Sequence, residues 1–163
     1  MLSGIKPLIL ALLGTAMTFS TPSVQASMEA SNGTVLITGA NRGLGLALSR
    51  HFIADGYHVV GTARSPEAAV ELQETGARVI QLDVTDDNSI AAMAAALEGV
   101  PLDIIVNNAG YIASLERGLD SFKNTSREDY LLSYNVNTVG PAMVIRALLP
   151  NLMLSSKEVK KIV

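Results

Sequence analysis

Three glycines at fixed spacing are the first residues in this sequence that could do chemistry. The stretch Thr38-Gly39-Ala40-Asn41-Arg42-Gly43-Leu44-Gly45 follows a short apolar run and precedes an amphipathic one. In such a stretch Gly39 permits a tight turn, Gly43 lets a pyrophosphate approach the backbone, and Gly45 allows close helix–strand packing. A helix that begins here presents free N–H groups and a positive dipole end. The stretch therefore predicts a phosphate-binding turn; a simple packing turn is the alternative.

The elements that must position this loop follow from the hydrophobic pattern. After Gly33, short apolar runs alternate with longer amphipathic ones. The pattern predicts strands at 34–38, 57–63, 77–82, 102–106 and 160–163, and helices at 43–54, 66–74, 86–97, from Ser126, and at about 135–153. This alternation predicts an α/β fold, a doubly wound parallel sheet of Rossmann-like type that is incomplete at its C-terminal edge. The length suits one domain over residues 34–163.

Helical spacing predicts which faces of two helices pack on the sheet. The apolar sets are Leu44, Leu48 and Phe52 in the first helix, and Val136, Val139, Met143 and Ala147 in the last. Ser126, with Asp129 three residues later, is a loose capping box. Ser155-Ser156-Lys157 is expected to be the polar end of the last helix.

Three further motifs lie at the ends of predicted strands or on the long helix. Asp83 ends the third strand in Leu82-Asp83-Val84, Asn107-Asn108-Ala109-Gly110 ends the fourth, and Asn137 lies in Asn135-Val136-Asn137-Thr138-Val139-Gly140. With the loop T-G-x-x-x-G-x-G, this order resembles the short-chain dehydrogenases/reductases from Thr34 to the C-terminus. The stretch from Gly140-Pro141 to Leu148-Leu149-Pro150 is most similar to the carbonyl-reductase and C-signal-like branch.

The resemblance implies an oxidoreductase that moves a hydride between a nicotinamide dinucleotide and a carbonyl or alcohol substrate. It implies that Asp83 contacts the adenine, that the Asn-Asn-Ala-Gly motif supports the sheet and the cofactor, and that Asn137 is catalytic. The residues implied to bind the cofactor are Thr38, Gly39, Asn41, Arg42, Gly43, Leu44, Gly45, Arg64, Asp83, Val84, Asn107, Ala109 and Gly110.

Charge at the end of the second strand predicts which dinucleotide is used. Proteins that bind NAD place an acid there for the ribose hydroxyls. Here Ala63 stands at that position, Arg64 follows it, and Arg42 lies in the glycine loop. Two guanidinium groups suit a 2′-phosphate, so NADP (NADPH) is the predicted cofactor; two solvated surface arginines are the alternative.

The sequence departs from the family pattern in its catalytic residues. The family uses a serine after the fifth strand and a tyrosine followed four residues later by a lysine. The residues found at that spacing after Tyr57, Tyr111, Tyr130 and Tyr134 are Gly61, Leu115, Tyr134 and Thr138. We therefore expect these 163 residues to be a truncated or fragmentary reductase that is inactive alone and of marginal stability. A non-catalytic NADP-binding module or sensor is the alternative, and the glycine spacing argues against a nucleotide-sugar epimerase.

Composition excludes several other classes of function. The formal net charge of −3 argues against a nucleic-acid partner, and without cysteine there is no disulfide or thiolate site. His51 and His58 are expected to be surface or packing residues, so no metal site is predicted.

The N-terminal segment resembles a targeting sequence more than a domain. Lys6, an apolar run over residues 7–19 and Val24-Gln25-Ala26 have the pattern of a signal peptide over residues 1–26, too short for a comfortable membrane span. Export or a periplasmic location follows if this leader is real, and a cytoplasmic one if the true start is Met28. No integral membrane domain is predicted, and the helix from about Asn135 is a candidate surface for a homo-oligomer.

Overall fold

The predicted strands form one parallel sheet in the computed structural model, which describes residues 31–112 and 124–163. The strands are β1 (Thr34–Ile37), β2 (His58–Ala63), β3 (Arg78–Gln81), β4 (Ile104–Val106) and β5 (Lys161–Ile162). Within these residues their order across the sheet is β3-β2-β1-β4-β5, and every neighbouring pair is parallel. The chain therefore reverses its direction of winding between β1 and β4, which confirms the doubly wound, Rossmann-like prediction. Ligands of such sheets bind beyond the carboxyl ends of the strands at this reversal.

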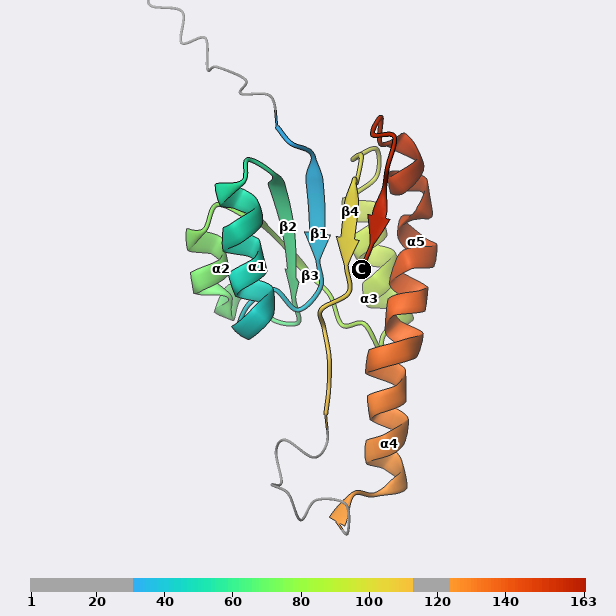
Figure 1. The fold of residues 1–163 in the computed structure, drawn as a ribbon. Helices are drawn as coiled ribbons and strands as arrows, with labels where there is room; N and C mark the ends of the chain where they lie inside the picture. The colour runs from blue at the N-terminus through green and yellow to red at the C-terminus, as the bar shows by residue number, and fades with distance from the viewer. Residues whose placement is uncertain (1–30, 113–123) are drawn as a thin grey trace, which may run out of the picture.

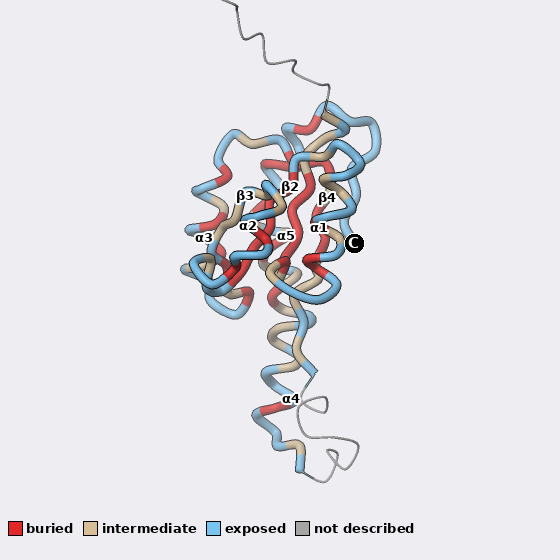
Figure 2. Tube along the Cα trace, turned by 90° about the vertical axis from the view of Figure 1, so that its left-hand side faces the viewer, coloured by how far each residue is buried: buried red, intermediate tan, exposed pale blue. Residues whose placement is uncertain are grey.

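Helices cover both faces of the sheet (Figure 1). Helix α1 (Gly43–Ala54) and the short α2 (Val70–Glu74) lie on one side, whereas α3 (Asp87–Ala96) and α5 (Gly140–Leu154) lie on the other. Helix α4 (Arg127–Tyr134) extends beyond the carboxyl edge of the sheet. Figure 2 shows that the buried residues are concentrated in the strands between these two layers.

Two apolar cores lie between the sheet and its helices because successive strand residues face opposite sides. In β1, Val35 and Ile37 belong to the core under α1 and α2, whereas Leu36 belongs to the core under α3 and α5. All three residues are fully buried. The sheet centre is therefore apolar on both faces, as expected for a parallel sheet.

The long helix differs from its prediction in extent and in its buried face. It begins at Arg127, not near Asn135, because α4, a π-helical turn η3 (Asn135–Val139) and α5 follow one another without a break. Ser126 does cap it, since its hydroxyl and the Asp129 carboxylate form a complete capping box. The buried residues of α5 are Gly140, Val144, Leu148, Asn151 and Leu152. Val136, Met143 and Ala147 of the predicted face are only partly buried against the core. The predicted face therefore differs from the observed one by about one residue along the helix.

Two further local predictions were wrong. Leu44 is 70% exposed, because Gly45, Leu46 and Ser49 form the buried side of α1. The predicted helix over 66–74 is divided into a 3₁₀ turn η1 (Pro66–Ala68) and α2.

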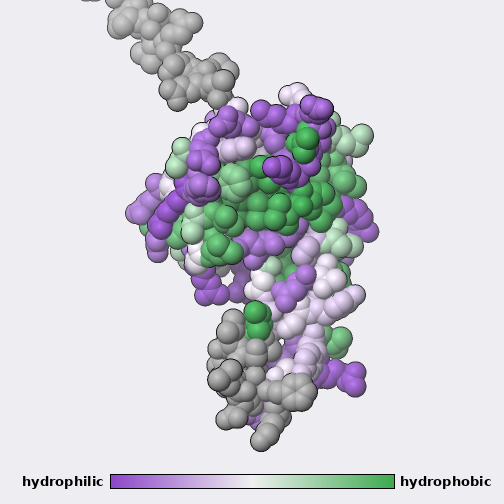
Figure 3. Space-filling model, viewed as in Figure 1, coloured by the Kyte–Doolittle hydropathy of each residue, from purple (hydrophilic) through white to green (hydrophobic). Residues whose placement is uncertain are grey.

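The surface of the sheet is partly apolar. In the view of Figure 3, apolar side chains gather between the α1–α2 side and the α5 side of the molecule.

The proposed leader, residues 1–26, lies outside the part of the chain that the structure describes.

No helix in the described ranges is both long enough and apolar enough to cross a lipid bilayer.

Candidate functional site

The glycine loop joins the carboxyl end of β1 to the start of α1. Gly39 and Gly43 have φ angles of +62° and +56°, which disfavour a residue with a side chain. A Cβ at Gly43 would have no atom within 4 Å, so the backbone there is open to a ligand. A Cβ at Gly45 would collide with the Gly39 carbonyl oxygen and lie 2.5 Å from Asn108 Nδ2. Each of the three positions therefore favours glycine for a different structural reason.

The N-terminus of α1 has the features of an anion site. Arg42 is the N-cap residue, and no side chain caps this end of the helix. The first N–H groups of a helix lack partners within the helix, and the helix dipole makes this end positive. Leu44, predicted as a cofactor contact, is the second residue of α1 and its side chain is exposed, and Asn41 is half-buried in the loop.

Asn108 fixes the glycine loop to the end of β4; the resemblance implied only that its motif supports the sheet and the cofactor, and Asn108 was not among the implied cofactor contacts. Its Nδ2 donates hydrogen bonds to the carbonyl oxygens of Thr38 (2.9 Å) and Gly39 (3.0 Å). The Ala109 N–H donates to Thr38 Oγ1 at 3.0 Å. The predicted contacts Thr38, Gly39 and Ala109 are therefore brought together. The duplicated asparagine was the available signal for Asn108.

Asp83 lies directly after β3 in a turn that holds its carboxylate. Asp83 Oδ1 accepts hydrogen bonds from the Thr85 hydroxyl at 2.7 Å and the Thr85 N–H at 2.9 Å. These bonds, with a smaller contribution from the positive charge of Arg64, hold the pKa of Asp83 below its ordinary value against the opposing effect of burial. The carboxylate is thus kept charged and oriented at the carboxyl edge of the sheet.

Val84, the next predicted contact, packs against the start of α5. Its side chain is buried, and a Cβ on Gly140 would lie 2.8 Å from its carbonyl oxygen. Only glycine at position 140 lets α5 come this close. Gly140 consequently joins the turn around Asp83 to the helix that carries Asn137.

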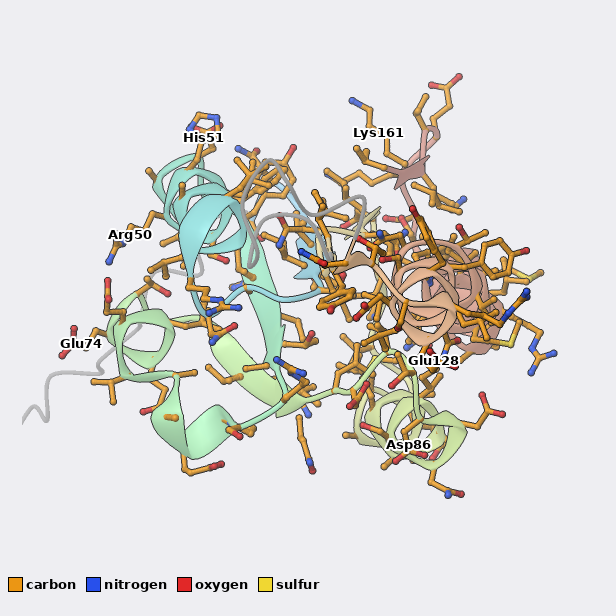
Figure 4. The ribbon with its side chains drawn as sticks, turned by 90° about the horizontal axis from the view of Figure 1, so that it is seen from below. Arg50, His51, Glu74, Asp86, Glu128 and Lys161 are labelled. Carbon is orange, nitrogen blue, oxygen red and sulfur yellow. The ribbon has the colours of Figure 1, made fainter. Side chains whose placement is uncertain are left out.

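Both predicted arginines lie at the carboxyl edge of the sheet and are exposed. Arg64 follows β2, whose last residue, Ala63, is 2% exposed. The glycine loop is tied to the same strand end, because the Ala40 N–H donates to the Thr62 carbonyl oxygen at 2.8 Å. Figure 4 looks at this edge from below, with Asp86 before α3 and Glu128 of α4 on its far side from α1.

Asn137 occupies the π-helical turn between α4 and α5. Its Nδ2 donates to the Tyr111 carbonyl oxygen at 2.7 Å, and its Oδ1 accepts from the Tyr111 N–H at 2.9 Å. The side chain therefore forms two hydrogen bonds with the backbone of the residue that follows Asn107-Asn108-Ala109-Gly110. Gly110 is close to this contact, since a Cβ there would lie 3.5 Å from Asn137 Oδ1. π-Helical turns are often found at functional sites.

Asn107 has the only buried side-chain oxygen without a hydrogen-bond partner among the described residues. Its Nδ2 donates a long bond of 3.4 Å to the Val163 carbonyl oxygen, while its Oδ1 is unpaired. A buried acceptor without a partner is costly. Its position at the carboxyl end of β4 places this acceptor beside the candidate site.

The histidines are placed away from this edge. His51 is exposed on α1 and lies 3.5 Å from the Asp55 carboxylate, and His58 is exposed at the start of β2. Arg50 and His51 point away from the body in Figure 4. Residues 31–112 and 124–163 contain no group of three His, Cys, Asp or Glu side chains that could hold a metal ion.

Comparison with known proteins gives a family match over most of the chain. The model of the short chain dehydrogenase family matches residues 33–163. NADPH-dependent pterin aldehyde reductase from Arabidopsis thaliana is 38% identical over 151 residues, which are 87% of this chain and 60% of the relative. NADP-dependent 3-hydroxy acid dehydrogenase YdfG from Escherichia coli K12 is 36% identical over 124 residues, 73% of this chain and 48% of the relative.

Solved structures agree with this match. A short-chain dehydrogenase/reductase from Burkholderia multivorans with bound NADP has a TM-score of 0.63 and 28% identity over 73% of this chain and 53% of its own. The chain thus spans about half the length of the relatives it matches. The family match, the sheet order and the glycine loop agree: this chain belongs to the short-chain dehydrogenase family.

Proposed function

We propose that this chain binds NADP(H) as the dinucleotide-binding part of an oxidoreductase that interconverts a carbonyl compound and an alcohol. The observation that carries the proposal is the glycine loop, which is open to a ligand at Gly43 and held in place by Asn108. Two relatives named as NADPH- or NADP-dependent enzymes and the NADP bound in a similar structure support the choice of cofactor.

The residues present fit this dinucleotide. The uncapped start of α1 suits the pyrophosphate, because free N–H groups and the positive end of the helix dipole favour an anion. Arg42 and Arg64 suit a 2′-phosphate, and the oriented carboxylate of Asp83 with Val84 suits the adenine side. Bound NADPH would supply the hydride, while this chain's residues orient the dinucleotide at the sheet edge.

The choice of NADP over NAD is tested at Arg64. We expect Arg64→Ala to weaken NADPH binding by ~1.5–3 kcal/mol, the contribution of a hydrogen bond to a charged group. NADH affinity should change little, because NADH has no 2′-phosphate. Isothermal titration with both dinucleotides measures this, with Arg78→Ala as the control because Arg78 is an exposed arginine at the start of β3. Unchanged NADPH affinity, or tighter NADH than NADPH binding by the parent chain, would contradict the proposal.

Binding and turnover are separate parts of the proposal. We propose that these 163 residues bind NADPH without turnover, because of the catalytic set only Asn137 is found in them. Loss of a positioned general acid typically lowers a rate by ~10²–10⁴. NADPH oxidation with a panel of aldehydes and ketones tests this, and rapid turnover would contradict it. A version extended by a Ser and Tyr-x-x-x-Lys that binds but does not react would instead favour the non-catalytic module or sensor.

A homo-oligomer formed through the long helix is part of the same proposal. On α4, Tyr130, Leu131 and Tyr134 are 52%, 60% and 60% exposed, so contact with a second copy would bury their apolar surface. Light scattering of the separated species measures the mass in solution. A strictly monomeric chain at high concentration would contradict this part without affecting cofactor binding.

A further inference from the structure

Asp103 is a buried carboxylate that lies at the opposite edge of the sheet from the glycine loop. It is 8% exposed and precedes β4 directly. Its Oδ2 accepts a hydrogen bond from the Thr34 N–H at 2.6 Å, and its Oδ1 accepts one from the Ser155 hydroxyl. Gly33, with a φ of +132°, makes room for it, since a Cβ there would collide with the carboxylate. Two segments distant from Asp103, residues 33–34 and Ser155, thus meet at one carboxylate.

Ser155 ends helix α5 as its C-cap residue, as the sequence predicts, but it is buried and has a distant partner. It is 6% exposed, donates to Asp103 and accepts a bond from the Lys157 N–H at 3.1 Å. Ser155 therefore holds the end of α5 against the start of β4. A partner 52 residues away could not be deduced from its neighbours in the sequence.

The apolar residues of β1 and β4 do not by themselves fix how these two strands align. Their residues are apolar toward both faces, and Val35, Leu36 and Ile37 pair with Ile104, Ile105 and Val106. A slip of one residue moves a strand by ~3.3 Å and exchanges its faces. Here it would replace one buried aliphatic side chain by another, so burial alone discriminates weakly between registers.

Polar contacts at both ends of the β1–β4 pair favour the observed register over a slipped one. At one end, Thr34 exchanges two hydrogen bonds with Asp103: N–H to Oδ2, and carbonyl oxygen from the Asp103 N–H at 2.9 Å. At the other end, the Thr38 N–H donates to the Val106 carbonyl oxygen at 3.0 Å, and Asn108 holds the loop. A slip would break both sets together and would take Asn108 away from the glycine loop.

We infer that Asp103 is a positioning residue that fixes the β1–β4 register and thereby holds Asn108 against the glycine loop. It acts across the sheet, four residues before the Asn107–Asn108 pair, and does not touch the cofactor site itself. The effect on cofactor affinity rests on the proposed NADP(H) binding, whereas the effect on register does not.

Two substitutions at Asp103 distinguish a role in hydrogen bonding from a role in packing alone. Asp103→Asn keeps an acceptor for the Thr34 N–H and a donor for Ser155 Oγ, so we expect NADPH affinity within about threefold of the parent. Asp103→Leu has a similar volume but no acceptor, and we expect a loss of at least about tenfold. If burial were the sole role of this position, Leu would be tolerated as well as Asn. Asp55→Asn, in an exposed pair with His51, is the control for removal of a negative charge.

A double-substitution cycle tests whether Asp103 acts through Asn108. In the full chain, we expect the affinity losses of Asp103→Leu and Asn108→Ala to be non-additive, with the double variant no weaker than the weaker single one. Additive losses, or Asp103→Leu affinity equal to that of the parent, would overturn the inference. Affinities are compared at a temperature where circular dichroism shows each variant to be folded.

Hydrogen exchange of the parent chain gives a test that needs neither a stable variant nor the cofactor. If the polar contacts at the two ends of the β1–β4 pair form one cooperative unit, the amides of Thr34 and Thr38 should open with the same free energy. Their exchange rates, corrected for intrinsic rates, should then lie within about threefold of each other. Thr34 exchanging a hundredfold faster than Thr38 would overturn the inference. If the parent binds no NADPH while the two amides exchange at similar rates, the proposed function is wrong, but the inference that Asp103 fixes the β1–β4 register is retained.

Discussion

The glycine loop and helix α4 lie at the same edge of the sheet but are held by different kinds of contact. Hydrogen bonds to two segments distant in sequence fix the loop: Asn108 and Ala109 bind Thr38 and Gly39, and Ala40 donates to Thr62. Helix α4 is fixed by its own capping box and by continuity with the π turn. Of its side chains, only Asp129 is buried.

This contrast teaches which part of the site is determined within the described chain. The loop is preorganised, because moving it would break hydrogen bonds to two strands. Helix α4 is a local structure whose apolar side chains remain available for further contacts. Substitutions should therefore be costly at the loop and nearly neutral on α4.

Among substitutions in the glycine loop and on α4, the largest effect is expected at Gly45, where a side chain would be forced against backbone. Gly45→Ala should lower the free energy of unfolding by ~2–3 kcal/mol, because overpacking against the Gly39 carbonyl oxygen outweighs the gain in helix propensity. Urea denaturation measures it. Gly43→Ala is the matched control: its Cβ has open space, so only the positive φ opposes it, at ~1–2 kcal/mol. Equal losses at both positions would remove the proposed distinction between packing and backbone strain.

A somewhat smaller loss is expected when Asn108 is shortened. Asn108→Ala removes two hydrogen bonds to loop carbonyls and should cost ~1–3 kcal/mol in unfolding free energy. Asn107→Ala is the control, because that side chain makes a single long bond and has an unpaired oxygen, and should cost less. If Asn107→Ala were the more damaging substitution in thermal unfolding, the loop would not depend on Asn108 as described.

A pH-dependent effect is expected at Thr85. Its hydrogen bonds lower the pKa of Asp83, so they stabilise the folded chain above the ordinary carboxyl range, near pH 4, and this contribution disappears as pH falls through the lowered pKa. Thr85→Ala should be less stable than the parent at pH 7, by about 1 kcal/mol or less, and the difference should close below pH 4. Unfolding measured from pH 7 to pH 3 tests this. A difference that grows on acidification would have the wrong sign.

The smallest effect on stability is expected on α4. Leu131→Lys changes a side chain that is 60% exposed and should alter the unfolding free energy by no more than ~0.5 kcal/mol. The comparison with Leu148→Ala, a fully buried residue of α5 expected to cost ~2–5 kcal/mol, is made by thermal unfolding. A large loss at Leu131 would show that α4 is integrated into the core after all.

The sequence and the structure agree best where a pattern repeats locally. Alternation of apolar and amphipathic runs predicted all five strands within a few residues, and the bounds of α1 match its prediction. Predictions failed for the buried face of α5 and for Leu44, because burial depends on how each helix is rotated against the sheet. The π turn at Asn135–Val139 left no signal in the apolar spacing.

The sequence alone determined the family, the parallel α/β architecture and the identity of the loop, because glycine spacing and apolar periodicity are local properties of the chain. Tertiary structure decided that Asn108 holds the loop, that Asn137 grips Tyr111, and that Asp103 joins Thr34 to Ser155. Each of these contacts joins residues at least 26 positions apart. Their partners are set by strand order and helix packing, which the sequence specifies only through the whole fold.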